Sequence, residues 1–75
     1  YIKIDGSFIR SLLISPDSRV IVRAIADIAK GFGKQTIAEF VDQEALLPIL
    51  KAYGITYGQG FYLGRPEKIK KIIEN

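Results

Sequence analysis

The stretch "QTIAEFVDQEALLPILKAYGITYG", Gln35 to Gly58, decides the fold. The mostly apolar run "QTIAEF" predicts a strand that ends near Glu39, and "ITYG" predicts another short strand. Between them, "DQEALLPILKAY" predicts a helix with Asp42 as its N-cap and Gly54 just past its end. Pro48 should kink this helix or shorten its first turns. Strands joined by a crossover helix indicate a parallel sheet.

The sequence before this stretch repeats the alternation. "YIKID" predicts a strand over Tyr1–Ile4, and "SFIRSLLI" predicts a helical turn or two. "RVIVRAIADIAKGFG" has apolar residues at 21, 24, 25, 28 and 29, which predicts an amphipathic helix. Its N-cap is expected at Asp17 or Ser18, and Gly31 and Gly33 mark its end.

After Gly58 the chain is expected to close with a helix, because "RPEKIKKIIEN" alternates lysine and isoleucine behind Pro66. The order strand, helix, strand, helix, strand, helix predicts an α/β fold. We treat residues 1–75 as a single unit, since no linker divides them. The chain begins at Tyr1, already inside a predicted strand, so we expect a piece of a longer protein.

The composition excludes several kinds of chemistry. There is no cysteine and no histidine, so thiol and imidazole chemistry and His-based zinc sites are excluded. The net charge is +3, and the positive residues are concentrated near the end of the chain. We interpret them as the solvated face of a helix, and this interpretation is favoured over binding to a nucleic-acid polymer. We find no membrane-length apolar run and no signal-peptide pattern, and therefore expect a cytoplasmic chain without membrane contact.

Polar residues are expected to meet where the predicted strands end. Lys3 and Asp5 close the first strand, Glu39 closes the second, and Gln59 closes the third. The carboxyl ends of parallel strands lie at one edge of a sheet, where ligands bind. A glutamate on a buried strand is costly unless it is paired or bound to metal. The glycines around Gln59 match neither a dinucleotide-binding loop nor a Walker loop.

Each of these residues also has a purely structural interpretation. Lys3 could form a salt bridge with Asp5, Asp42 could be only a helix cap, and Gln59 could satisfy loop backbone groups. As a set, carboxylates with one lysine suit Mg²⁺ or Mn²⁺ and attack on a phosphodiester. A complete site would need carboxylates from elsewhere.

Three blocks carry a resemblance to a known family. "YIKIDGSFI", "IAEFVD" and "YGQGFYLGRP" resemble, in this order, the C-terminal part of an EAL domain, the bacterial cyclic-di-GMP phosphodiesterase. The family fold is a modified TIM barrel, and the resemblance implies that this chain corresponds to its last three strand–helix units. It also implies Mg²⁺ or Mn²⁺ in the complete domain and cyclic-di-GMP as the partner.

The resemblance further implies roles for single residues. Lys3 would assist the hydrolytic water, and Glu39 would be a metal ligand or catalytic carboxylate. Gln59 would support the catalytic set and touch the substrate, and Arg65 would be a substrate contact. Asp5 and Asp42 would support the site from beside it; they complete the candidate set Lys3, Asp5, Glu39, Asp42, Gln59 and Arg65.

The chain departs from the family pattern in two ways. Asp42 stands where the family usually has a second glutamate, and the upstream E-A-L triplet, asparagine and paired aspartates are absent. "EAL" at Glu44–Leu46 is a coincidence, since it follows Glu39. We therefore expect the isolated chain to be inactive and, with its strand edges cut open, to form homo-oligomers. A non-catalytic EAL module that binds dinucleotide or protein is the alternative, and an unrelated nucleic-acid-binding domain is a third hypothesis.

Overall fold

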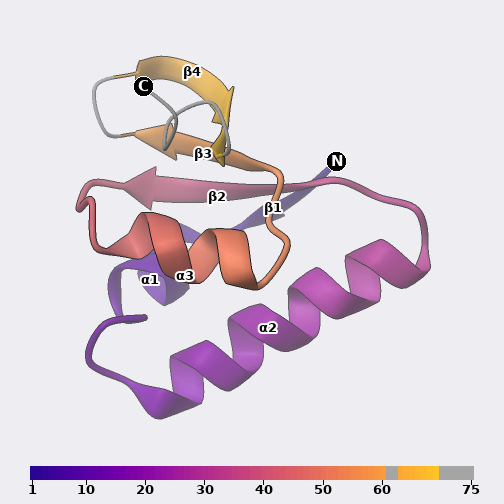
Figure 1. Ribbon diagram of the computed structural model, residues 1–75, viewed down its shortest axis with the longest axis horizontal. Coiled ribbons are helices and arrows are strands. Elements are labelled where there is room, and N and C mark those ends of the chain that lie inside the picture. The colour runs from indigo at the N-terminus through magenta and orange to yellow at the C-terminus, as the bar shows by residue number, and fades with distance from the viewer. Residues whose placement is uncertain (61–62, 70–75) are drawn as a thin grey trace.

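The sheet has four strands in the order β1-β2-β3-β4, as seen in a computed structural model that describes residues 1–60 and 63–69, with the backbone alone for 63–65. β1, β2 and β3 are parallel, and β4 is antiparallel to β3. The elements in chain order are β1 (Ile2–Ile4), α1 (Gly6–Arg10), α2 (Pro16–Gly31), β2 (Thr36–Val41), α3 (Leu46–Ala52), β3 (Tyr57–Gly60) and β4 (Leu63–Lys68). Figure 1 shows the helices below β2, with β3 and β4 above it.

All three helices pack against one face of this sheet. Ile4 of β1 pairs in register with Ala38 of β2, and both are buried in one hydrophobic cluster with residues of every helix. Leu50 of α3 and Val22 of α2 are fully buried there. The predicted α/β class with parallel strand–helix units is therefore confirmed for β1 to β3. Among the described residues, no helix is long and apolar enough to cross a membrane.

The N-cap of α2 differs from the prediction. Ser15 caps the helix, and its side chain accepts a hydrogen bond from the backbone N–H of Ser18 at 3.2 Å. Pro16 then occupies the first helical position, where a missing N–H costs nothing. Asp17 and Ser18, the predicted caps, lie inside the first turn instead.

The buried stripe of α2 is also rotated from the predicted one. Ala29 and the partly buried Ile25 confirm two predicted positions, but Val22 and Ala26 are buried instead of Ile21 and Ile28, which are 41% and 58% exposed. The helix is apolar around much of its circumference, so periodicity alone did not select the inner face. Small alanines lie on the inner face, where they allow close approach to the sheet.

The α3 helix is shorter than predicted. It starts at Leu46 after Ala45, which makes no side-chain cap bond, so Asp42 is not the N-cap. Pro48 lies in the first turn, where its missing N–H breaks no helical hydrogen bond. Gly54 follows the C-cap with φ +76°, which confirms its predicted place at the helix end.

The segment after α3 forms β3, which was predicted, and β4, which was not. β3 spans Tyr57–Gly60 and is therefore shifted by two residues from the predicted strand at residues 55–58. Pro66 belongs to β4 and does not start a helix. It lies on an edge strand beside a register shift, where proline is tolerated. The rest of the predicted helix, residues 70–75, lies outside the described residues.

Candidate functional site

The carboxyl ends of β1, β2 and β3 lie at one edge of the sheet because these strands are parallel. The arrowheads of β2 and β3 both point to the left in Figure 1 and mark this carboxyl edge. Asp5 follows β1 directly, while Glu39 and Gln59 lie within β2 and β3. The structure therefore brings the strand positions predicted for the site to the same edge.

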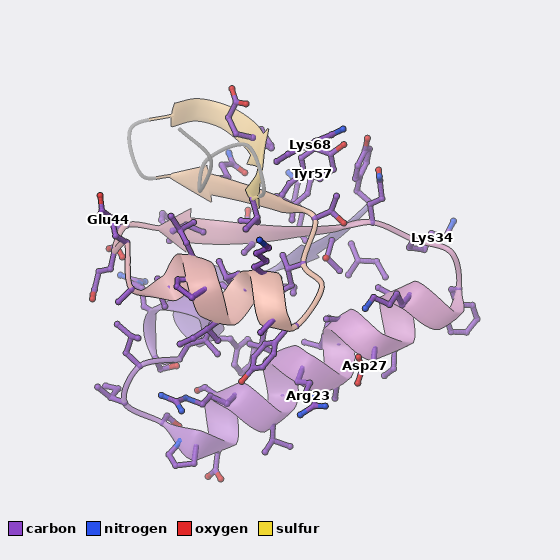
Figure 2. The ribbon with its side chains drawn as sticks, in the orientation of Figure 1. Arg23, Asp27, Lys34, Glu44, Tyr57 and Lys68 are labelled. Atoms are coloured by element: carbon purple, nitrogen blue, oxygen red, sulfur yellow. The ribbon has the colours of Figure 1, made fainter. Side chains whose placement is uncertain are left out.

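Lys3, Glu39 and Gln59 belong to the face of the sheet opposite the helices. Lys3 pairs in register with Ile37, which pairs with Tyr57, while the alternate positions face the helices and the core. Lys3 is exposed although the next residue, Ile4, is 1% exposed. Glu39 and Gln59 each lie two residues further along their strands than Ile37 and Tyr57, and so share this open face. In Figure 2, Tyr57 lies above β2, on the side away from the helices.

A bulge in β2 lies at the centre of the carboxyl edge. Ala38 pairs with Gly58 and Val41 pairs with Gly60, so that Glu39 and Phe40 together oppose the single residue Gln59. The strand thus runs past its predicted end near Glu39.

The two side chains expected to do chemistry have few partners. Glu39 is half-buried, and within residues 1–60 and 63–69 the structure shows no hydrogen bond or ion pair of its side chain. Among the residues that the structure describes, the Oε1 atom of Gln59 is buried and has no hydrogen-bond partner. A half-buried carboxylate and an orphaned amide oxygen on neighbouring strands form a place for a ligand that supplies positive charge or donors.

Asp5 has a structural task. It is the N-cap of α1, where its carboxylate accepts hydrogen bonds from the backbone N–H of Ser7, at 3.1 Å, and from the Ser7 hydroxyl. The hydroxyl of Ser7, and then its backbone N–H, lower the pKa of Asp5. The carboxylate is directed to α1, so the Lys3–Asp5 salt bridge that the sequence left open is not formed.

The remaining predicted residues are less defined. Asp42 is exposed and follows β2 directly. The side chain of Arg65 lies outside the described part of the chain. At the opposite end of the open face, Tyr1, Ile37, Tyr57 and Pro66 line a shallow hollow of about 250 Å³.

Sequence reasoning missed three residues around the bulge. The Phe40 ring lies against Gly6, and the Arg10 guanidinium lies 5.2 Å from the centre of that ring. The spacing of these residues in the sequence does not predict the contact. It forms only because α1 packs against β2 in the folded chain.

Whether these residues fit a divalent metal can be judged from their donor atoms. The Glu39 carboxylate and the free Gln59 Oε1 are oxygens, which Mg²⁺ and Mn²⁺ prefer. However, the described residues contain no group of three acidic residues that could enclose an ion. The chain therefore offers part of a metal site.

Parallel strand–helix units with oxygen donors at their carboxyl ends define the class: a segment of an α/β fold with a candidate site near the strand ends. The family model "EAL domain" matches residues 1–66, and the chain belongs to this family.

Relatives and solved structures support this family. The cyclic di-GMP phosphodiesterase PdeB of Shewanella oneidensis is 36% identical over 74 residues, covering 99% of this chain and 9% of PdeB. The EAL enzyme Bd1971, solved with cAMP and cyclic-di-GMP, has a TM-score of 0.78 at 28% identity, covering 96% of this chain and 19% of that structure. The FimX EAL domain from Pseudomonas aeruginosa, solved with c-di-GMP, has a TM-score of 0.75 at 34% identity, covering 89% of this chain and 27% of that one. The chain thus spans about a tenth of the curated relative's length.

Proposed function

We propose that residues 1–75 form the C-terminal part of an EAL domain that hydrolyses cyclic-di-GMP in the cytoplasm. The observation that carries the proposal is the placement of Lys3, Glu39 and Gln59 on the open face of three parallel strands. A ligand that lies along this face, from the level of Ile37 to the carboxyl edge, would meet the ammonium, the carboxylate and the amide oxygen. These groups suit a phosphodiester and the water that attacks it.

Each residue has a distinct role in this proposal. Lys3 holds the attacking water or a phosphate oxygen with its ammonium group. Glu39 supplies a carboxylate at the reacting centre, and Gln59 orients the ligand across the bulge. Asp42 supports Glu39 from beside it, and Arg65 contacts the substrate. Asp5 acts indirectly, because its carboxylate fixes the start of α1 next to the site.

Glu39 would also hold the metal, Mg²⁺ or Mn²⁺, with further ligands from outside this chain. When bound, such an ion polarises the phosphate and lowers the pKa of water. Because the described residues offer only part of its ligand set, the isolated chain should not turn over cyclic-di-GMP. Mg²⁺-dependent hydrolysis by the 75-residue chain would refute this assignment.

The proposal is tested in a completed domain, defined as an active EAL phosphodiesterase domain whose matching segment is replaced by this chain. Glu39→Gln keeps the shape of the side chain but removes its charge, and turnover should fall by roughly 10²-fold or more. Glu44→Gln is the matched control, since Glu44 is exposed in the segment after β2 (Figure 2). Equal activity in the two variants would return Glu39 to a structural role.

A second candidate function is dinucleotide or protein binding without turnover. The exposed aspartate at position 42, one methylene shorter than the glutamate of the family pattern, favours it. Calorimetric titration of the completed domain with cyclic-di-GMP separates the two candidates. Binding without hydrolysis would support the second candidate and exclude the first.

We further propose that the chain forms homo-oligomers when it is isolated. α2 and its C-cap expose a stripe of large apolar side chains, namely Val20, Ile21, Ile28 and Phe32, which are 41–76% exposed. Tyr1, at the amino end of the open face, is 74% exposed as well. Burying these surfaces against a second copy would stabilise a small core. Sedimentation at micromolar concentration should show a dimer or larger species, whereas a stable monomer would contradict the proposal.

A further inference from the structure

Phe40 has a backbone conformation that its side chain disfavours. Its φ is +57°, and it is the one non-glycine residue with positive φ among the described residues. A bulky side chain is rarely found in this region, and such residues persist only where the surrounding structure holds them. Phe40 is also 57% exposed, so burial of its ring alone does not explain the conformation.

Two contacts hold the Phe40 ring. A Cβ atom placed on Gly6 would overlap the Cδ2 atom of Phe40, so the ring occupies the space that a side chain at position 6 would need. The Arg10 guanidinium lies 5.2 Å from the ring centre, within the range of a cation–π contact. Both residues belong to α1, which Asp5 caps. The ring thus ties the end of β2 to α1.

The contact of the Phe40 ring with α1 lies next to Glu39. Glu39 and Phe40 are the two bulge residues opposite Gln59, so the backbone turn at Phe40 determines how the Glu39 carboxylate lies relative to the Gln59 amide. Because the Glu39 side chain has no hydrogen bond or ion pair among the described residues, the local backbone is left to orient it.

We infer that Phe40 is a positioning residue: its ring, seated on Gly6 and Arg10, holds the β2 bulge in the conformation that directs Glu39 toward Gln59 and the ligand. The inference rests on the proposed function and adds to it a residue that acts on the reaction only through Glu39. It requires no contact between Phe40 and the substrate.

Kinetics of the completed domain test the inference. Phe40→Ala should lower kcat on the order of 10- to 100-fold with little change in KM, because small misplacements of a catalytic group are costly. Phe40→Tyr keeps the ring and should retain activity near the unmodified level. Phe32→Ala is the matched control, since Phe32 is 76% exposed at the end of α2, and it should change neither constant.

A double-variant cycle separates positioning from general stability. In the Glu39→Gln background, Phe40→Ala should cause no further loss of kcat, because there is no carboxylate left to place. A further 10-fold loss in that background would overturn the inference. So would an unchanged kcat in Phe40→Ala alone.

Nuclear magnetic resonance of the 75-residue chain gives a measurement independent of activity. The Phe40 ring protons should show nuclear Overhauser contacts to the Gly6 α protons, and Phe40→Ala should shift the Gln59 side-chain amide resonances. Phe32→Ala should leave those resonances in place. Absence of the contact, or unshifted Gln59 resonances, would overturn the inference. If the unmodified completed domain fails to hydrolyse cyclic-di-GMP, the proposed function fails, and these spectra decide the inference alone.

Discussion

Replacing Gly60 with alanine should break the junction between β2 and β3 at the candidate site. Gly60 has φ +112°, a conformation that L side chains rarely adopt. A Cβ atom at this position would lie 2.9 Å from the backbone N of Val41 and 3.2 Å from the Cα of Phe40. Both neighbours are backbone atoms of the bulge, so neither can move aside by rotating a side chain.

The size of the effect follows from these two costs. A non-glycine residue forced into a sparsely populated region costs of order 1–3 kcal/mol. The contact with Val41 N adds to this, because the bulge must move away from β3. We expect a total loss of about 2–4 kcal/mol, against a stability of roughly 3–5 kcal/mol for a scaffold of this size. At the middle of these ranges Gly60→Ala should leave about 1 kcal/mol of stability and lower the urea midpoint strongly.

Gly31→Ala provides the matched control. Gly31 is the last residue of α2, and a Cβ atom there would have nothing within 4 Å. The alanine should stabilise the chain by about 0.4–1 kcal/mol, because it reduces the entropy of the unfolded state. Urea denaturation followed by circular dichroism, at a fixed protein concentration, measures both variants. Similar midpoints for Gly60→Ala and Gly31→Ala would refute the reasoning about the close approach of β3 to the bulge.

Two further predictions concern the core and the cap of α1. Leu50→Ala should destabilise the chain by about 2–5 kcal/mol because Leu50 is fully buried, whereas Ile14→Ala, at an 84% exposed position outside the apolar stripe of α2, should change stability by less than about 0.5 kcal/mol; urea midpoints compare them. The hydrogen bonds from Ser7 lower the pKa of Asp5 in the folded chain. The Asp5 carboxylate therefore contributes its full stabilisation above pH 3.8, the usual pKa of an aspartate, and this stabilisation is lost as the pH falls through the lower pKa of the folded chain. The protection factor of the Ser7 amide, which is its intrinsic exchange rate divided by its observed rate, should fall below about pH 4 in the unmodified chain; Asp5→Asn, which keeps a cap without a charge, should remove that fall. A Ser7 amide that responds to acid equally in both chains would contradict this account.

The parallel core of the fold was predictable, since buried strands and amphipathic helices alternate along residues 1–60. β4 was not, because Pro66 satisfies two rules at once: it can start a helix, and it can lie on an edge strand. The prediction of the buried face of α2 was partly wrong for a related reason. The helix carries apolar residues on more than one side, and only packing against the sheet determines which side is buried. Tertiary contacts decided both cases.

The candidate residues could be predicted as a set on the parallel strands, but their geometry could not. The strand order and the alternation of side chains place Lys3, Glu39 and Gln59 on one face of the sheet. That Glu39 and Phe40 would share a bulge could not be predicted, because the positive φ of Phe40 has no signal in a sequence where glycine or asparagine would be the usual marker. Asp5 was expected to support the site, and the structure shows it engaged in capping α1.

The bulge gives a physical reason for the three sequence blocks that resemble the EAL family to occur together. Gly6 in the first block leaves room for the ring of Phe40, which belongs to the second block. Gly60 in the third block leaves room on the other side for the backbone of Phe40 and Val41. A side chain at either glycine would push against the bulge, and through it against Glu39. Gly60 of "YGQG" could be mistaken for part of a phosphate loop, but its role is to allow the close approach of two strands. The three blocks therefore meet around Phe40, which has a positive φ and lies beside Glu39.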